Sequence, residues 1–200
     1  YIADGLFRTE EDIAKHATQN GGEGLGRIRY RDLNEDGKID EDDRTWIGSP
    51  HPDFMYGLNI ELSYKNFDLS AFFYGVNGID VNTYVVKSET DFWSINDVRS
   101  NKGTRLLDAW SPTNPDSNIP AITALNANDE GRMSTYFVEN GSFLKLRNLQ
   151  LGYTLPRKIS EKAYIEKCRI YVSGQNLFTI KSKNFSGVDP ENAGFGYPIP

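Results

Sequence analysis

Apolar and polar residues alternate along several stretches of this chain, which is the pattern of β-strands with two unlike faces. The clearest run spans residues 54–64, where every second position is apolar: Phe54, Tyr56, Leu58, Ile60, Leu62 and Tyr64. A second run begins at Phe67, after the short turn Tyr64-Lys65-Asn66, and continues to about residue 76. The pattern therefore predicts an antiparallel β-hairpin over residues 54–76.

Two further strands are expected within residues 142–180. Apolar residues alternate with polar ones over 149–153, and the same spacing returns over 169–180. Lys145 and Arg147 interrupt the apolar face in the first half of the earlier strand. The interruption indicates that this half either lies above a bilayer or is displaced by a β-bulge.

Long polar regions separate these strands. Residues 1–53 contain one expected helix, which begins after Thr9, an N-cap residue followed by acidic residues. Residues 77–141 and 181–200 are expected to be long loops. Alternation of short and long connections is typical of outer-membrane β-barrels, with short periplasmic turns and long extracellular loops. A soluble β-sandwich with one solvated face gives a similar pattern, so the pattern alone leaves both open.

Composition narrows the class of protein. The 200 residues include 28 Asp and Glu against 22 Lys and Arg, a net charge of −6, which argues against nucleic acid as a partner. No run approaches the roughly 18 apolar residues of a transmembrane helix, whereas the alternating strands of a membrane β-barrel keep hydropathy low. The single cysteine, Cys168, excludes an intrachain disulfide and a cysteine-based zinc site.

An acidic loop at residues 32–43 carries the sharpest local motif, because its first six positions match the calcium loop D-x-[DN]-x-[DN]-G. Calcium prefers hard oxygen ligands in flexible geometry. The predicted ligands are Asp32, Asn34, Asp36, the backbone carbonyl of Lys38, Asp40 and Asp43. Position twelve is Asp43 rather than the usual glutamate, and the flanks do not read as two helices. We expect a structural calcium ion; an acidic turn without metal is the alternative.

Three tryptophans lie in the predicted loops and are candidates for contact with a ligand or partner: Trp46, Trp93 and Trp110. Exposed aromatic rings can stack on sugars or pack against another protein. Large aromatic residues more often pack loops against one another, and this is the favoured interpretation.

Several blocks of the sequence together resemble the SusC/RagA family of TonB-dependent outer-membrane transporters. The blocks are GRIRYRDLNEDGKIDEDDR at 26–44, IGSP at 47–50, PDFMYGL at 52–58, FDLSAFFYG at 67–75, GSFLKLRNLQLGY at 141–153, SGQNLFT at 173–179 and GVDPE at 187–191. They follow the family's order and cover most of the chain from about residue 26. Each block alone is weak, whereas the set is specific.

The resemblance implies an all-β fold, a C-terminal portion of an antiparallel transmembrane barrel of about 22 strands with a plugged lumen. It also implies a bacterial outer-membrane location, import of glycans or peptides, a SusD-like lipoprotein partner and energy from the TonB complex. The plug, the TonB box and the last strand are expected to lie outside these residues. No catalysis is expected.

The family resemblance and the alternation of apolar and polar residues predict the same placement of each segment relative to the membrane. Residues 1–53, 77–141 and 181–200 would be extracellular, and the hairpin at 54–76 and the strands within 142–180 would form barrel wall. The residues expected to face lipid are Leu58, Ile60, Leu62, Leu69, Phe73, Ile170 and Val172. Those expected to face the lumen are Asn59, Glu61, Ser63, Asp68, Ser70, Arg169, Ser173 and Gln175.

Two other functions stay open from the residues themselves. One is a secreted, calcium-stabilised β-module that binds carbohydrate, and the other is a glycan-acting enzyme. The two catalytic carboxylates of a glycosidase are identified by their distance in space. The sequence alone therefore does not show whether any two of the 28 acidic residues form such a pair.

Overall fold

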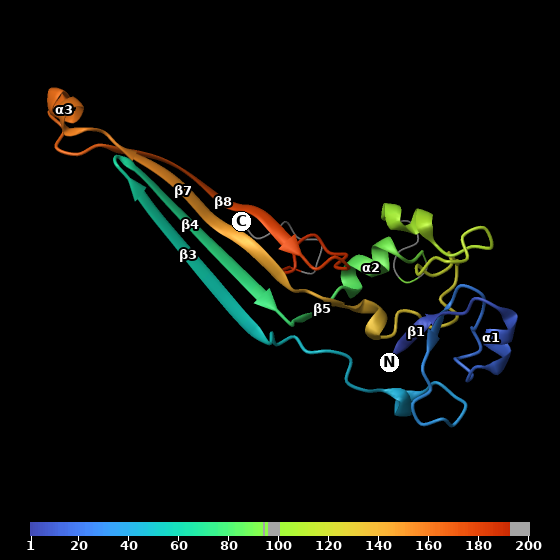
Figure 1. Ribbon diagram of the computed structural model, residues 1–200. Helices are drawn as coiled ribbons and strands as arrows, with labels where there is room; N and C mark the ends of the chain where they lie inside the picture. Colours follow the sequence, from blue (N-terminus) through green and yellow to red (C-terminus); the bar gives the residue numbers. More distant parts are fainter. Residues whose placement is uncertain (94, 96–100, 193–200) are drawn as a thin grey trace. The chain divides into compact units, whose positions relative to one another are not determined.

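A computed structural model describes residues 1–93, 95 and 101–192 of the chain, which form two compact units (Figure 1). The sheet unit comprises Pro50–Asp80 and Asn140–Phe185. The loop unit comprises Tyr1–Ser49, Val81–Glu139 and the described part of the tail from Ser186. No helix in the described ranges is long and apolar enough to cross a membrane.

The sheet unit is one four-stranded antiparallel sheet in the order β3-β4-β7-β8. Its strands are β3 (Phe54–Tyr64), β4 (Phe67–Asn77), β7 (Phe143–Thr154) and β8 (Arg169–Lys181). The predicted hairpin over 54–76 is confirmed, with Tyr64 paired to Phe67 at its turn. A short helix, α3 (Arg157–Ser160), and a 3-10 turn (Glu161–Ala163) lie in the connection from β7 to β8.

The strand register places the apolar residues in continuous rows across one face of the sheet. Directly paired residues of neighbouring strands share a face, so each row can be followed from β3 to β8. Three successive rows are Leu62–Leu69–Leu151–Val172, Ile60–Ala71–Leu149–Gly174 and Leu58–Phe73–Leu146–Phe178. This face is therefore almost entirely aliphatic and aromatic.

A β-bulge at Arg147 explains the irregular alternation in β7. Against β4, Leu146 and Asn148 pair with the consecutive residues Phe73 and Phe72, which leaves Arg147 as the extra residue. Against β8 the same two residues pair with Phe178 and Gln175, so β8 is one residue longer than β7 at this point. Leu146 and Leu149 consequently lie on the same face although they are three positions apart. Of the two explanations that the sequence allows for the interrupted face, the bulge is confirmed.

The loop unit contains short elements. Strands β1 (Ala3–Leu6) and β2 (Ile28–Tyr30) pair antiparallel, and a second small sheet pairs β5 (Asp80–Asn82) with β6 (Val138–Asn140). Its helices are α1 (Glu10–Lys15), α2 (Tyr84–Thr90) and the 3-10 turns Glu41–Asp43, Thr104–Asp108 and Thr135–Phe137. Helix α1 begins after Thr9 as predicted, because the Thr9 and Asp12 side chains each accept the other's backbone N–H at 3.1 Å.

A shared apolar core joins two regions that the sequence presents as separate loops. Its buried members come from both sides of the β3–β4 hairpin: Leu6, Ile28, Tyr30, Ile39, Phe92, Trp110 and Phe137. The described parts of residues 1–49 and 81–139 therefore fold against each other. Their apolar residues follow no regular period, so alternation does not reveal this core.

A buried polar cluster also links these two regions. Arg27 forms an ion pair with Glu130, and both side chains are almost completely buried. The Ile28 N–H donates to Glu130 Oε1 at 2.8 Å, and Gln19 Nε2 donates to Asn128 Oδ1 at 2.9 Å. Burial raises the pKa of Glu130 above its ordinary value, although Arg27 beside it acts in the opposite direction.

Substitution Glu130→Ala is expected to destabilise the loop unit, because it leaves Arg27 as a buried charge without its carboxylate. Breaking one side of a buried ion pair costs about 3–5 kcal/mol. Hydrogen–deuterium exchange of the Ile28 amide in the whole receptor measures the effect. The control is Glu11→Ala, which removes an exposed ion pair with Lys15. Equal exchange in the two variants would contradict this role of Glu130.

Candidate functional site

The apolar face of the sheet unit is uncovered in the described part of the chain. Leu58 is 56% exposed and Leu62 is 58% exposed, and Val172 on the far strand is 69% exposed. A soluble β-sandwich would bury these side chains beneath a second layer. Exposed apolar surface on this scale marks a face that contacts lipid or another protein.

Aromatic residues bound this face at both ends. Tyr64, Phe67 and Tyr153 form one row at the turn of the hairpin, and Phe54 and Tyr56 lie at the other end of β3. Strands β3 and β4 each have 11 residues, which agrees with the 9–11 residues that a tilted strand needs to cross a bilayer. Flanking aromatic girdles are typical of outer-membrane barrels.

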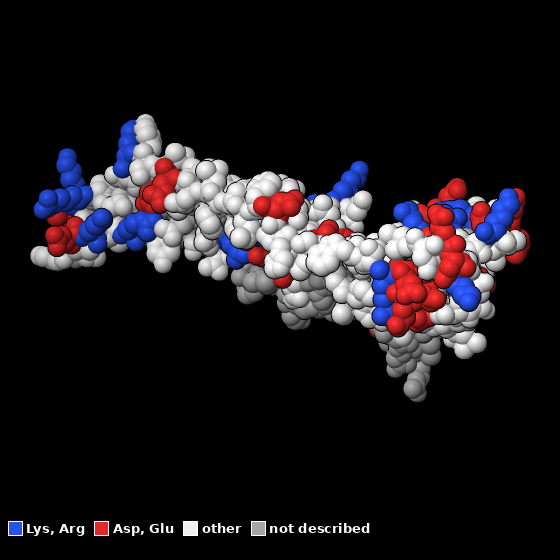
Figure 2. Space-filling model, turned by 90° about the horizontal axis from the view of Figure 1, so that it is seen from below, with Lys and Arg blue, Asp and Glu red and all other residues white. Residues whose placement is uncertain are grey.

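Charged side chains are sparse over the strands and gather beyond them. Figure 2 shows scattered charged side chains over the visible side of the strand region, and both basic and acidic side chains near the α3 end of the sheet unit. That end carries Arg157 and Lys158 of α3 and Lys162 of the following turn. Glu161 in the same turn pairs with Arg157 at 2.7 Å, so this end is charged with both signs. Strands with few charges next to a charged end agree with a sheet that crosses an apolar layer.

The opposite face of the sheet is polar over its turn-side half. Successive rows there are Ser63–Asp68–Gly152–Tyr171, Glu61–Ser70–Gln150–Ser173 and Asn59–Phe72–Asn148–Gln175. All residues that the sequence predicts to share the lumen side lie on this face, and all those predicted to face lipid lie on the other. The sheet thus has two chemically distinct faces.

An ion pair spans three strands on this polar face. Arg169 Nε of β8 donates to Asp68 Oδ1 of β4 at 3.0 Å, and Arg169 Nη2 contacts Asp68 Oδ2. Gly152 of the intervening strand β7 lies beneath the pair, and a Cβ there would approach Asp68 Oδ2 to 2.5 Å. The glycine therefore makes room for a bidentate bridge between strands that are not neighbours.

The acidic loop at 32–43 is shaped by its own side chains. Asp32 accepts backbone N–H bonds from Glu35 at 2.7 Å and Gly37 at 2.8 Å, and Asp36 accepts one from Lys38 at 2.9 Å. Gly37 has φ +84°, the left-handed conformation that the motif requires at its sixth position. The segments at Thr18 and Lys38 pair as a parallel bridge.

Two residues anchor this loop in the loop unit. Ile39, at the eighth position of the loop, is 4% exposed and lies in the core. Asp43, the predicted ligand at position twelve, is buried and accepts N–H bonds from Leu33 at 2.6 Å and Asp40 at 2.9 Å. Its carboxylate thus connects the two ends of the loop.

The fit of this loop to calcium is partial. Each carboxylate oxygen has a second lone pair, so the N–H bonds do not exhaust its capacity as a ligand. Within the described ranges, however, no three Asp, Glu, His or Cys side chains form a group that could hold a metal ion. The donor types and the glycine fit calcium, whereas the carboxylates do not converge here.

The three candidate tryptophans have different environments. Trp110 is 8% exposed and packs in the core of the loop unit, where it leaves no room for a side chain at Gly26. Its position fits the packing interpretation. Trp93 is partly exposed, and Trp46 is 78% exposed, so Trp46 is the one best placed to meet a ligand or partner.

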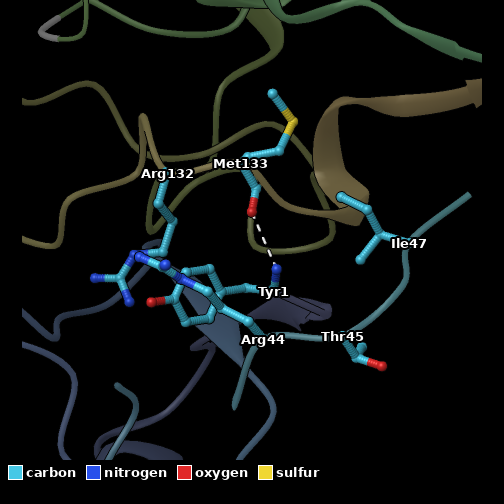
Figure 3. Close-up of a pocket in the computed structure, with 6 residues that line it drawn as sticks. All are labelled: Tyr1, Arg44, Thr45, Ile47, Arg132 and Met133. Atoms are coloured by element: carbon cyan, nitrogen blue, oxygen red, sulfur yellow. Dashed lines mark hydrogen bonds between the residues drawn. The ribbon is translucent and has the colours of Figure 1, made fainter. Parts of the chain in front are cut away.

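A cavity of about 420 Å³ lies in the loop unit close to the end of the acidic loop (Figure 3). Tyr1, Arg44, Thr45, Ile47, Arg132 and Met133 line it. No sequence motif marks this cavity, because its two arginines are 88 positions apart and only folding brings them to the same tyrosine ring.

The known proteins that are similar to this chain in sequence all belong to one class, as the following comparisons show. No model of a protein family matches the chain. It is 36% identical over 175 residues to TonB-dependent receptor P3 of Formosa agariphila, an alignment that covers 88% of this chain and 16% of that receptor. It is 33% identical over 165 residues to TonB-dependent receptor SusC of Bacteroides thetaiotaomicron, covering 81% of this chain and 15% of SusC.

A solved structure of the RagAB peptide transporter has the same fold, with a TM-score of 0.69 and 24% identity over 96% of this chain and 19% of that chain. The four-stranded sheet is thus part of the barrel of a TonB-dependent receptor in the bacterial outer membrane. Within that class, the chain belongs with the SusC/RagA transporters, as its sequence blocks indicate. It spans less than a fifth of the length of these relatives, which are named as receptors and transporters.

Substitution Ile60→Arg is expected to impair assembly of the receptor into the outer membrane, because Ile60 lies mid-strand on the uncovered apolar face. Arginine on the lipid face costs about 2–4 kcal/mol at the bilayer midplane. The matched control is Glu61→Arg, one residue further on and on the polar face. Heat-modifiable electrophoretic mobility of outer-membrane fractions reports folded receptor. Equal yields of the two variants would show that the faces are assigned wrongly.

Proposed function

We propose that this chain forms barrel wall and extracellular surface in an importer that carries oligosaccharides or peptides across the outer membrane. The uncovered apolar face contacts membrane lipid, and the polar face with Asp68 and Arg169 lines the lumen. The observation that carries the proposal is the separation of these two faces across four strands, with aromatic residues at both ends of the apolar one.

The relatives support the finer parts of this proposal. RagAB is titled a peptide transporter, and the SusC and Formosa agariphila relatives are named TonB-dependent receptors. We infer that a SusD-like surface lipoprotein cooperates with this chain and that the TonB complex acts through regions outside it. The exposed Trp46 in the loop unit is a candidate contact for that lipoprotein or for the ligand.

The alternative, a secreted β-module that binds carbohydrate, is less consistent with the sheet. Such a module would have to remain in water with Leu58, Leu62 and Val172 more than half exposed. A large contiguous apolar face in water favours aggregation. In an importer embedded in the membrane, lipid acyl chains cover this face.

Uptake in the native host tests the importer directly. Deletion of the receptor is expected to abolish accumulation of a fluorescently labelled oligosaccharide or peptide ligand, and loss of TonB is expected to have the same effect. Deletion of the SusD-like lipoprotein is expected to reduce uptake at low ligand concentration. Uptake that is independent of TonB would overturn the energy source, and unchanged uptake without the receptor would overturn the proposal.

We also propose that the acidic loop binds calcium through Asp32, Asn34, Asp36, Asp40 and the Lys38 carbonyl, with Asp43 closing the loop. The support is the order of oxygen donors, the left-handed Gly37 and the buried Ile39. Bound calcium would neutralise carboxylates that otherwise repel one another. Its role would be structural, with the weak affinity of extracellular modules, about 10⁻⁴–10⁻³ M.

Removal of calcium with a chelator is expected to increase hydrogen–deuterium exchange over residues 32–43 in the purified receptor. Asp36→Ala should remove this calcium dependence, because it deletes a predicted ligand at position five. Glu35→Ala is the control, since it deletes the neighbouring carboxylate at a position whose side chain is not a ligand in the motif. If the chelator does not change hydrogen–deuterium exchange over residues 32–43, or if the two variants respond to it equally, the loop is an acidic turn without metal.

A further inference from the structure

The cavity in the loop unit is lined by positively charged side chains, although the chain as a whole is acidic. Among the described residues that line it, two are arginines and none is acidic, whereas the chain as a whole has a net charge of −6. Figure 3 shows the side chains of Arg44 and Arg132 extending toward the ring of Tyr1. The guanidinium carbons lie 5.8 Å and 5.0 Å from the centroid of that ring.

Arg132 is held rigidly at the cavity wall. Its side chain is only 6% exposed, and its guanidinium also lies 4.7 Å from the Tyr30 ring centroid. Nε donates to the Asp129 carbonyl at 3.0 Å and Nη2 to the Asn128 carbonyl at 3.2 Å. These bonds fix the orientation of the guanidinium and use two of its five N–H donors.

Arg44 is the more accessible of the two. Its side chain is 59% exposed, and Nη2 forms a 2.9 Å ion pair with Glu41. Asp129 is the acidic neighbour of Arg132, at 3.6 Å. Each arginine therefore has one carboxylate neighbour, and neither carboxylate lines the cavity. The charged side chains that line the cavity are therefore both cationic.

The tyrosine between these arginines is also fixed. The Tyr1 backbone nitrogen donates to the Met133 carbonyl at 3.0 Å, and the Tyr1 carbonyl accepts the Thr135 N–H at 3.0 Å. Ile47 and Met133 add apolar surface to the wall. The cavity thus combines an aromatic ring and aliphatic groups with two positive charges, and about 420 Å³ is within the usual range for small-molecule pockets.

We propose that this cavity, which we call the Arg44–Arg132 pocket, binds an acidic sugar residue of a glycan. The two guanidiniums pair with its carboxylate or sulfate ester, and the apolar wall of Ile47, Met133 and the Tyr1 ring contacts the C–H groups of the sugar. Both features of the pocket are then used, whereas a neutral sugar offers the two guanidiniums no charged partner inside the pocket. The inference rests on the importer function and narrows its ligand class.

Isothermal titration calorimetry on the whole purified receptor tests the pocket. The probes are an oligogalacturonate, which carries carboxylates, a carrageenan oligosaccharide, which carries sulfate esters, and a neutral cello-oligosaccharide. Arg44→Gln is expected to weaken binding of the acidic probe about tenfold, the loss of one charge-assisted contact. Arg44→Lys keeps the charge but not the planar fork, so its binding should be intermediate.

Arg31→Gln is the matched control. Arg31 is 53% exposed, pairs with Asp4, flanks the acidic loop on its other side and does not line the pocket. Equal losses in Arg44→Gln and Arg31→Gln would assign the effect to the acidic loop and overturn the pocket. The proposal also fails if the wild-type receptor binds neither acidic probe, or if an acidic peptide binds while both glycans do not.

Failure of the pocket can be separated from failure of the importer. TonB-dependent uptake of a neutral glycan or peptide that is insensitive to Arg44→Gln leaves the importer function standing and removes the acidic-sugar assignment. If uptake is lost on deletion of a different receptor and not on deletion of this one, both the importer function and the acidic-sugar assignment are wrong.

Discussion

The strand register of the sheet unit is the constraint on which the rest of this account depends. Side chains in a strand alternate strictly between two faces, so a shift of one residue would move every leucine of a strand to the polar side. The observed register instead aligns Leu62, Leu69, Leu151 and Val172 in one row and places Glu61, Ser70, Gln150 and Ser173 in the next row on the opposite face. A sheet with one apolar and one polar face needs an apolar phase on one side only.

The sheet could largely be predicted from the sequence, because one physical rule governs it. Residues 54–64 have an apolar side chain at every second position, and Met55 is the one large apolar residue between them, so the hairpin and its two faces follow directly. Strand β7 breaks the rule at one position, and the bulge at Arg147 resolves it by placing Leu146 and Leu149 on the same side. The bridge over Gly152 was not foreseeable, since it joins β4 to β8 and depends on the spatial order of the strands.

The loop unit shows where sequence reasoning ends. Its core brings Ile28 and Ile39 together with Trp110 and Phe137, which are separated from them by the whole hairpin. Short elements without hydrophobic periodicity give no sequence signal for such long-range contacts. The Arg44–Arg132 pocket depends on these contacts. The acidic loop is the exception, because its donors and Gly37 lie within twelve consecutive residues and the motif alone identifies it.

Site-directed spin labelling of the reconstituted receptor shows which residues of β3 contact lipid and which contact water. Single cysteines are placed at positions 58–63 of β3 in a Cys168→Ser background, because Cys168 is a free thiol. Relaxation by oxygen, which dissolves in acyl chains, is expected to be high at 58, 60 and 62, and relaxation by a water-soluble nickel complex high at 59, 61 and 63. Loss of this alternation, or its reversal, would contradict a lipid-facing role for Leu58, Ile60 and Leu62.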